Sequence, residues 1–299
     1  MHLSLGPSLN CAPGVSLRDR SPQWGSPPPN EGTRSTNKAV AGLSGRETVA
    51  RTVGVVVTSD VLARRKGSYG IDAPYLLPIP LALIVAHILQ GVVSGTAWPF
   101  VAAGFVTACV GCGLHTSLRG KFAVWSELLD GLALRGDEHV LDLGCGRGAV
   151  LLGAAQRLTT GGSIGIDLWR KADQSGNAAA ATWRNAIAEG VAERVELCTA
   201  EMTALPLEDD SFDLVLSSVA VHNVKGRAGR DRAIAEAVRV LRPGGRLLIA
   251  DILATDEYRL RLTQLDMANV ARRGLGWRMW WSGPWLPTRL VTATKRPTR

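Results

Sequence analysis

Two adjacent stretches without any Asp, Glu, Lys or Arg constrain the fold of this chain more than any other feature. They cover residues 76–94 and 96–114, and each is nineteen residues long. A helix of about 20 apolar residues spans the hydrocarbon core of a bilayer. Gly95 separates the stretches and Pro99 follows it closely, which is typical of a tight turn. The sequence therefore predicts two antiparallel transmembrane helices, at about 76–94 and 96–114.

The alternative interpretation is a pair of helices buried in the core of a soluble protein. Charge-free runs of this length are uncommon in soluble cores. The flanking charges also favour a membrane hairpin, because Arg64, Arg65 and Lys66 precede the first run, and Arg119 and Lys121 follow the second. Lys and Arg collect on the cytoplasmic side of membrane helices. We therefore expect a multi-pass protein of the cell membrane with both flanks in the cytoplasm.

The segment before these helices, residues 1–70, is rich in Pro, Gly, Ser, Thr and Arg. It has no sustained apolar periodicity before Val53, and this composition is typical of disorder. Whether the segment belongs to the native product is left open. The net charge of +8 is largely explained by this segment and the flanks of the helices. Because no module that reads RNA or DNA is recognisable, we expect no nucleic-acid partner.

Strands and helices alternate after the second apolar run, which indicates a doubly wound, mostly parallel α/β sheet. Such sheets bind their ligands at the carboxyl ends of the strands. The expected strands cover residues 139–144, 162–167, 194–199, 211–218 and 244–252, and the expected helices cover residues 149–158, 177–188 and 229–241.

A glycine-rich turn, "DLGCGRG", follows the first expected strand and leads into a helix. Glycine at every second position lets the backbone approach a ligand closely. The spacing differs from the G-x-G-x-x-G of dinucleotide sites. Asp142 precedes the turn, where its carboxylate would repel a pyrophosphate and attract an ammonium group. Asp167 ends the second strand, where it can accept both ribose hydroxyls. The pattern indicates a ligand with a ribose, an ammonium and a carboxylate, and no phosphate.

At this point the chain resembles the class I S-adenosylmethionine-dependent methyltransferases (methyltransferase type 11), especially the quinone and sterol branch. Four blocks in the family's order carry the resemblance over residues 121–299: "VLDLGCGRG", "GID", "LPLEDDSFDLVLSS" and "EAVRVLRPGGRLLIAD". It implies a Rossmann-like, seven-stranded sheet that ends in an antiparallel hairpin, at 267–273 and 288–294. With the membrane hairpin, the expected domains are 1–70, 71–118 and 119–299.

The resemblance also implies S-adenosyl-L-methionine as the cofactor, and positions for the residues that bind it. Asp142 should approach the methionine amino group, and Asp167 should bind the ribose. The other expected contacts are Gly144, Gly146 and Gly148 along the methionyl and ribose part, Leu168, Glu201 and Met202 around the adenine, and Ser217 beside the reactive methyl. Taken singly, Asp142 could cap a helix and Asp167 could be a turn carboxylate.

Two residues after the fourth strand are candidates for catalysis. His222 could act as a general base if the acceptor must lose a proton, and Asn223 could orient the acceptor. Alternatively, His222 only packs or caps the loop. We expect no metal site, since Cys109-x-x-Cys112 lies in an apolar run without a second pair of ligands.

Four of the nine tryptophans lie close together, at Trp277, Trp280, Trp281 and Trp285. The family's topology puts them in the loop between the last two strands, with several arginines nearby. Trp at headgroup depth with Arg facing anionic lipid is a favourable pairing. We expect this loop to rest on the membrane or to close over an apolar acceptor.

The function indicated by these features is a membrane-anchored methyltransferase for a small, lipophilic acceptor, which would be a small molecule or a lipid. A soluble acceptor, or a non-catalytic membrane protein that binds the cofactor, remains open. An oxidoreductase on a related sheet is disfavoured by the glycine spacing and the lack of a pyrophosphate site.

Overall fold

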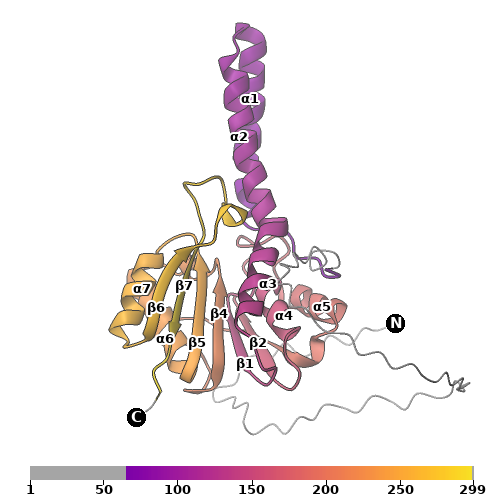
Figure 1. Cartoon of the computed structure of the whole chain (residues 1–299). Coiled ribbons are helices and arrows are strands. Elements are labelled where there is room, and N and C mark those ends of the chain that lie inside the picture. Colours follow the sequence, from indigo (N-terminus) through magenta and orange to yellow (C-terminus); the bar gives the residue numbers. More distant parts are fainter. Residues whose placement is uncertain (1–64, 298–299) are drawn as a thin grey trace, which may run out of the picture.

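The computed structural model describes residues 65–297, which form an α/β domain and a helical hairpin that projects from it (Figure 1). The hairpin consists of α1, Pro78–Ser94, and α2, Trp98–His115. Gly91 lets the two helices approach closely, because a Cβ atom there would lie 2.6 Å from the ring of Phe100. The two apolar runs therefore form antiparallel helices, as the sequence predicts.

The second hairpin helix does not end where the sequence analysis places the domain boundary. It continues through a π-helical segment, Thr116–Gly120, into α3, Lys121–Gly131. Trp125 anchors α3 on the sheet, since it is 2% exposed and its Nε1 donates to Ser218 Oγ at 2.9 Å. The boundary expected at residue 119 thus lies inside one uninterrupted helix.

The sheet has seven strands in the order β3-β2-β1-β4-β5-β7-β6, and its first five are parallel. β7 is antiparallel to both β5 and β6, which confirms the expected C-terminal hairpin. The strands are β1 His139–Leu143, β2 Gly162–Asp167, β3 Val195–Thr199, β4 Phe212–Ser218, β5 Leu241–Asp251, β6 Ala268–Gly274 and β7 Arg289–Thr294. β5 begins three residues earlier than expected, because Leu241 already pairs with Phe212.

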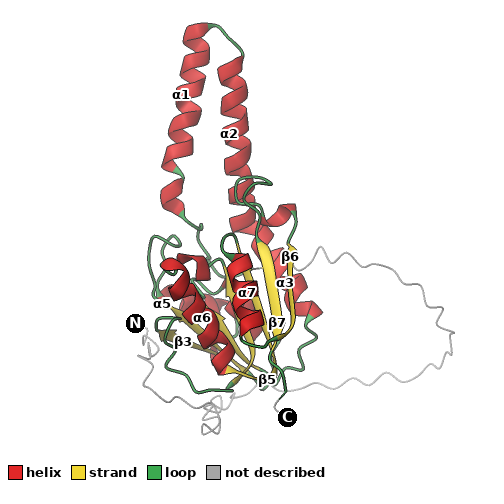
Figure 2. Ribbon diagram, turned by 90° about the vertical axis from the view of Figure 1, so that its left-hand side faces the viewer, coloured by secondary structure: helices red, strands yellow, loops and turns green. Residues whose placement is uncertain are grey.

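Helices cover both faces of the sheet, as expected for a doubly wound fold (Figure 2). One apolar core lies under α6, Gly226–Val240, and α7, Thr255–Gln264. The opposite face packs against α3, α4, Ala149–Ala155, and α5, Ala179–Glu189. The charged helix α7 was not expected from the sequence, since only Thr255, Tyr258 and Leu262 of it are buried.

Residues 65–73 form a strap between the hairpin and the domain. The expected disordered segment, residues 1–70, lies outside the described residues as far as residue 64. Residues 65–70 differ from that expectation, because the N–H groups of Lys66 and Gly67 donate to Glu189 Oε1 at 3.0 and 2.9 Å. Hydrogen bonds to α5 therefore hold this part of the chain.

The strap also joins the hairpin to the loop after β2 through Asp72. Its carboxylate accepts from Ser117 Oγ at 2.8 Å and from Lys121 Nζ at 2.6 Å, both from the helix that continues α2. The other oxygen accepts from Gln174 Nε2 at 2.9 Å. Asp72 therefore ties three segments together.

The carboxyl edge of the parallel strands faces the hairpin. Arg289, at the start of β7, pairs with Asp251, at the end of β5, so the loop between β6 and β7 lies at this edge. Thr116, just after α2, donates from its Oγ1 to the carbonyl of Trp280 in that loop at 2.5 Å. Figure 1 shows the same arrangement, with the hairpin above this edge.

Candidate functional site

The glycine-rich turn after β1 adopts a backbone that only glycine takes without strain. Gly144, Gly146 and Gly148 have φ angles of 74°, 50° and 88°, all in the left-handed region. At Gly144 a Cβ atom would lie 2.2 Å from the Cβ of Ala220, in the loop after β4. The turn and the β4 loop therefore meet directly at the carboxyl edge.

Asp142 is a buried carboxylate without a partner. It is 1% exposed, and neither of its oxygens has a hydrogen bond within residues 65–297. Burial raises the pKa of Asp142 to about 7. A buried polar group without a partner is costly, so a cationic donor at this position would be strongly favoured.

Asp167, at the end of β2, holds the turn in place. Its Oδ2 accepts from the N–H of Gly146 at 2.8 Å, and its Oδ1 accepts from the N–H of Trp169 at 2.5 Å and from Asn177 Nδ2 at 3.2 Å. An ionised carboxylate offers about four acceptor positions. A diol that takes two of them must displace at least one of these donors.

Gln174 links the turn to the strap, and the sequence analysis did not identify it. Its Oε1 accepts from the N–H of Arg147 at 2.8 Å, while its Nε2 binds Asp72. No local signal marks this residue, because its partners lie 27 and 102 positions away.

The expected adenine contacts separate in the structure. Leu168 is half-buried beside Asp167, and Met202 lies near the turn, with its Cε 3.6 Å from where a Cβ of Gly144 would be. Glu201 is exposed and lies 3.9 Å from a guanidinium nitrogen of Arg170. Glu201 therefore faces solvent at the rim.

Trp169 is a further residue at this end of the sheet that the sequence analysis missed. Its Nε1 donates to Thr199 Oγ1, at the end of β3, at 2.7 Å. Its φ of 57° is unusual for a bulky residue. The indole thus bridges the carboxyl ends of β2 and β3.

Ser217 is at the end of β4, as expected, but its hydroxyl is already engaged. It is fully buried and donates to the carbonyl of Leu143 at 2.8 Å. This bond fastens β4 to the end of β1 just before the glycine turn.

His222 and Asn223 lie in a short 3₁₀ helix, Val221–Asn223, after β4. His222 Nδ1 is 2.6 Å from Oδ1 of Asp251, which is fully buried at the end of β5. Asn223 is exposed. Since Ala220 touches the glycine turn, the 3₁₀ helix begins beside it.

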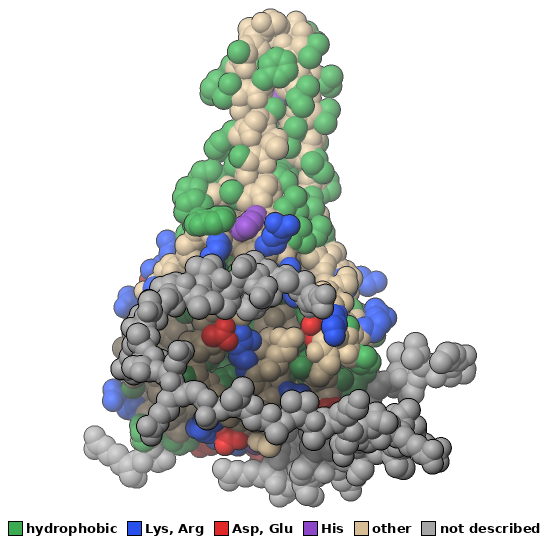
Figure 3. Space-filling view, turned by 45° about the vertical axis from the view of Figure 1, so that its right-hand side comes forward, with side chains coloured by type: hydrophobic (Ala, Val, Ile, Leu, Met, Phe, Trp, Pro, Cys, Tyr) green, Lys and Arg blue, Asp and Glu red, His purple; other side chains and the backbone are tan. Residues whose placement is uncertain are grey.

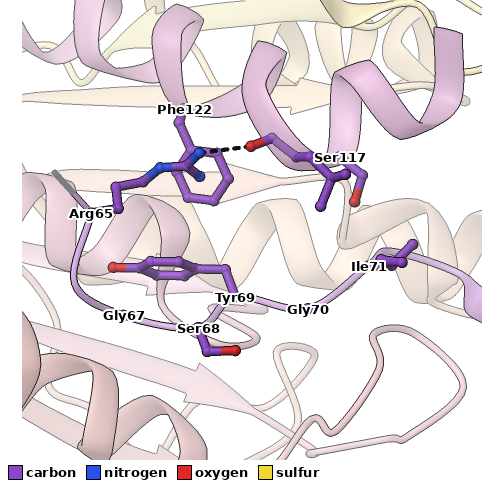
Figure 4. A pocket seen from close by; sticks show the side chains of 9 residues that line it. Arg65, Gly67, Ser68, Tyr69, Gly70, Ile71, Ser117 and Phe122 are labelled. Atoms are coloured by element: carbon purple, nitrogen blue, oxygen red, sulfur yellow. Dashed lines mark hydrogen bonds between the residues drawn. The ribbon is translucent and has the colours of Figure 1, made fainter. Parts of the chain in front are cut away.

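A separate pocket of about 420 Å³ lies between the strap and the start of α3 (Figure 4). The guanidinium of Arg65 lies 3.6 Å from the centre of the Phe122 ring and donates to the carbonyl of Leu118 at 2.7 Å. Tyr69 packs edge-on against the same ring. None of the expected site residues lines this pocket. Within residues 65–297 no group of three or more His, Cys, Asp or Glu could hold a metal ion.

Comparison with known proteins places the glycine turn, β2 to β4 and most of β5 in one family. Residues 141–249 match the family model described as a methyltransferase domain. The sterol 4-C-methyltransferase of Caenorhabditis elegans is 29% identical over 44% of this chain and 36% of its own length. A ubiquinone/menaquinone biosynthesis C-methyltransferase of Ruegeria sp. is 32% identical over 44% of this chain and 50% of its own length.

The chain thus covers half or less of the length of these curated relatives. Among solved structures, a geranyl diphosphate methyltransferase in complex with SAM is 18% identical, with a TM-score of 0.48 over 61% of this chain and 87% of that one.

Proposed function

Residues 141–249 form an S-adenosylmethionine-dependent methyltransferase domain, and from this premise we propose that the protein is a membrane-anchored methyltransferase for a small, lipophilic acceptor. One observation carries the proposal: the edge of the sheet with the glycine turn is the edge that faces the apolar hairpin. A lipophilic acceptor held in the bilayer would lie on the same side of the domain as the site.

The residues of the turn fit S-adenosyl-L-methionine. Asp142 has two buried oxygens without a partner, and the methionine ammonium would supply one. Gly144, Gly146 and Gly148 leave room for the methionyl part, and Asp167 would take the ribose hydroxyls. When bound, the cofactor supplies a methyl group on a sulfonium, so the leaving group is already activated. The chain's own contribution is then to orient the acceptor in line with that methyl.

The hairpin has the features of a membrane anchor. Two helices, Pro74–Ser94 and Trp98–Gly131, are long and apolar enough to cross a bilayer, and only 6% and 17% of their most apolar stretches are buried. Core helices of soluble proteins are mostly buried instead. Figure 3 shows hydrophobic side chains over the hairpin and Lys and Arg at its base. This charge pattern supports a cytoplasmic methyltransferase domain.

The loop between β6 and β7, residues 275–288 and hereafter the Trp loop, extends the apolar surface of the hairpin. Trp277 and Trp285 are 62% and 58% exposed. Trp285 packs on Phe105 of α2 with ring centres 5.6 Å apart, and Trp277 stacks on His115 at 5.0 Å. Exposed Trp rings beside an apolar helix suit the headgroup region. The Trp loop would then border the path of the acceptor from the bilayer to His222 and Asn223.

Two measurements on the full chain test the proposal. Calorimetry should detect binding of S-adenosylhomocysteine, and its absence would refute the methyltransferase assignment. In proteoliposomes made from a membrane lipid extract, methyl-labelled cofactor should transfer its label to the lipid fraction. Label found only in water-soluble products would refute the lipophilic acceptor and leave the methyltransferase assignment standing.

The Trp loop is tested by the double variant Trp277→Ser/Trp285→Ser in the same proteoliposomes. We expect labelling of the lipid fraction to fall at least fivefold at unchanged affinity for S-adenosylhomocysteine, on the scale of about 1 kcal/mol. Ile187→Ser is the matched control, because Ile187 is 59% exposed on α5, away from the hairpin. Equal effects of the two changes would contradict a role at the bilayer.

A further inference from the structure

Four hydrogen bonds fix the carboxylate of Asp251 in the fully buried end of β5. Its Oδ1 accepts from the N–H of Ile252 at 2.8 Å and lies 2.6 Å from Nδ1 of His222. Its Oδ2 accepts from the N–H of His222 at 3.0 Å and from the hydroxyl of Tyr258 at 3.2 Å. All four acceptor positions of the carboxylate are filled, so its orientation is determined.

This arrangement selects one tautomer of His222. A carboxylate only accepts hydrogen bonds, so the short contact requires a proton on Nδ1. In the neutral imidazole the other ring nitrogen, Nε2, then carries a lone pair. Asp251 holds the backbone and the ring of His222 at once, which leaves the ring little freedom to turn.

The free side of the ring belongs to the cofactor edge. The His222 side chain is 15% exposed and lies two residues after Ala220, which touches the glycine turn. Asp173, in the loop after β2, is within electrostatic range of both His222 and Asp167. His222 thus lies between the loops that follow β2 and β4, where a doubly wound sheet binds its ligands.

We propose that Asp251, supported by Tyr258, is a positioning residue that keeps Nε2 of His222 ready to take a proton, and that the acceptor is therefore a weakly acidic hydroxyl compound such as a phenol or an enol. This inference rests on the proposed function and names its substrate class. An acceptor that attacks without losing a proton would have no use for such a histidine.

The step balances with the groups at hand. The hydroxyl proton of the acceptor moves to Nε2, and the electron pair this frees forms a bond from the acceptor to the methyl carbon. The bond from that carbon to sulfur breaks, and its electron pair stays on sulfur. Asp251 remains ionised and stabilises the imidazolium, which later releases the proton to water.

Single-turnover and steady-state kinetics with a phenolic acceptor test the roles. His222→Gln should lower kcat by about 10²- to 10⁴-fold, the usual contribution of a general base. Asp251→Asn should lower kcat at least tenfold, with KM for the cofactor and affinity for S-adenosylhomocysteine unchanged. Tyr258→Phe should have a smaller effect on kcat. The control is Asp256→Asn, which changes an exposed carboxylate on the same helix as Tyr258 and should leave kcat unchanged.

A measurement independent of turnover uses nitrogen NMR of the full chain labelled with ¹⁵N-histidine, with His222→Gln to assign the signals. Wild type should show His222 protonated at Nδ1, and Asp251→Asn should shift it toward the other tautomer. Protonation at Nε2 in wild type would overturn the inference, even if a variant fails to fold.

The kinetics separate this inference from the proposed function. Wild-type turnover that survives His222→Gln within twofold would overturn the proton-transfer role and leave the methyltransferase assignment intact. Absence of S-adenosylhomocysteine binding by wild type would overturn the proposed function, whatever the tautomer of His222.

Discussion

At the scale of single residues, the site contains a group that is unfavourable for the fold alone. Asp142 is buried without a partner, whereas Asp167 and Asp251 each accept several hydrogen bonds. Unsatisfied buried carboxylates destabilise a folded chain unless a ligand supplies the missing donor. The different surroundings of these three carboxylates thus separate a group that awaits a ligand from groups that hold loops in place.

The pKa of Asp142 gives a prediction of how stability depends on pH. Its folded value of about 7 lies above the 3.8 of an unperturbed Asp, so the folded state binds the proton more tightly. The stability of the ligand-free protein should be highest below pH 4 with respect to this group, and should decline by about 4 kcal/mol as the pH rises from 4 to 7.

Asp142→Asn should remove this decline and raise the melting temperature at pH 8, while weakening binding of S-adenosylhomocysteine at least tenfold. Thermal unfolding and calorimetry in detergent check both effects. Asp137→Asn, at an exposed carboxylate, is the control. A variant that melts like wild type at every pH and still binds the ligand normally would contradict the role of Asp142.

At the scale of elements, the contact between α2 and the Trp loop depends on glycine. A Cβ atom at Gly113 would lie 2.5 Å from the carbonyl oxygen of Trp281, and one at Gly120 would overlap the carbonyl of Arg278. Backbone from the last sheet connection therefore rests directly on the helix that leads into α3. This contact fixes the position of Trp277 and Trp285 beside the hairpin.

Substitutions of two nearby glycines test this contact. Gly113→Ala should destabilise the protein by about 1–3 kcal/mol, because backbone must move to admit the methyl group. Gly111→Ala is the matched control in the same helix, since nothing lies within 4 Å of its Cβ position. Thermal unfolding should separate the two variants, and tryptophan fluorescence should report a displaced loop in the first alone. Indistinguishable variants would mean that the Trp loop does not pack on α2.

At the scale of the whole molecule, the hairpin and the α/β domain are joined twice. One connection is the continuous helix from α2 to α3, and the other is the strap with Asp72 at its centre. Two connections on the same side restrict rotation of the domain against the hairpin. The cofactor edge is thereby held toward the bilayer that we propose around the hairpin, so the acceptor has a short path to it.

The orientation of the chain follows as a prediction of topology. In sealed vesicles, Thr96→Cys, in the turn between α1 and α2, should react with a membrane-impermeant maleimide only from the side opposite the methyltransferase domain. Glu208→Cys, on the exposed surface of the domain, should react only from the other side. Wild type measures the reaction of the native cysteines. Labelling of both new cysteines from one side would refute the two-span hairpin.

The sequence by itself determined what depends on local patterns. The two apolar runs, the strand–helix alternation and the turn around Gly146 follow from periodicity and backbone preferences within a few residues, and the structure confirms these elements. Helix α7 escaped because its buried positions are few, and the strap escaped because its composition resembles that of the segment before it.

Only the tertiary structure decided which side chains meet. His222 and Asp251 are 29 positions apart, and Gln174 reaches Asp72 across 102. Ser217 was expected at the reactive methyl, but the register of β1 and β4 gives its hydroxyl to the carbonyl of Leu143. Such contacts depend on strand register and on the paths of loops, which many distant residues set together. A local pattern carries no information about them, and for this reason the partners of each carboxylate had to be read from the fold.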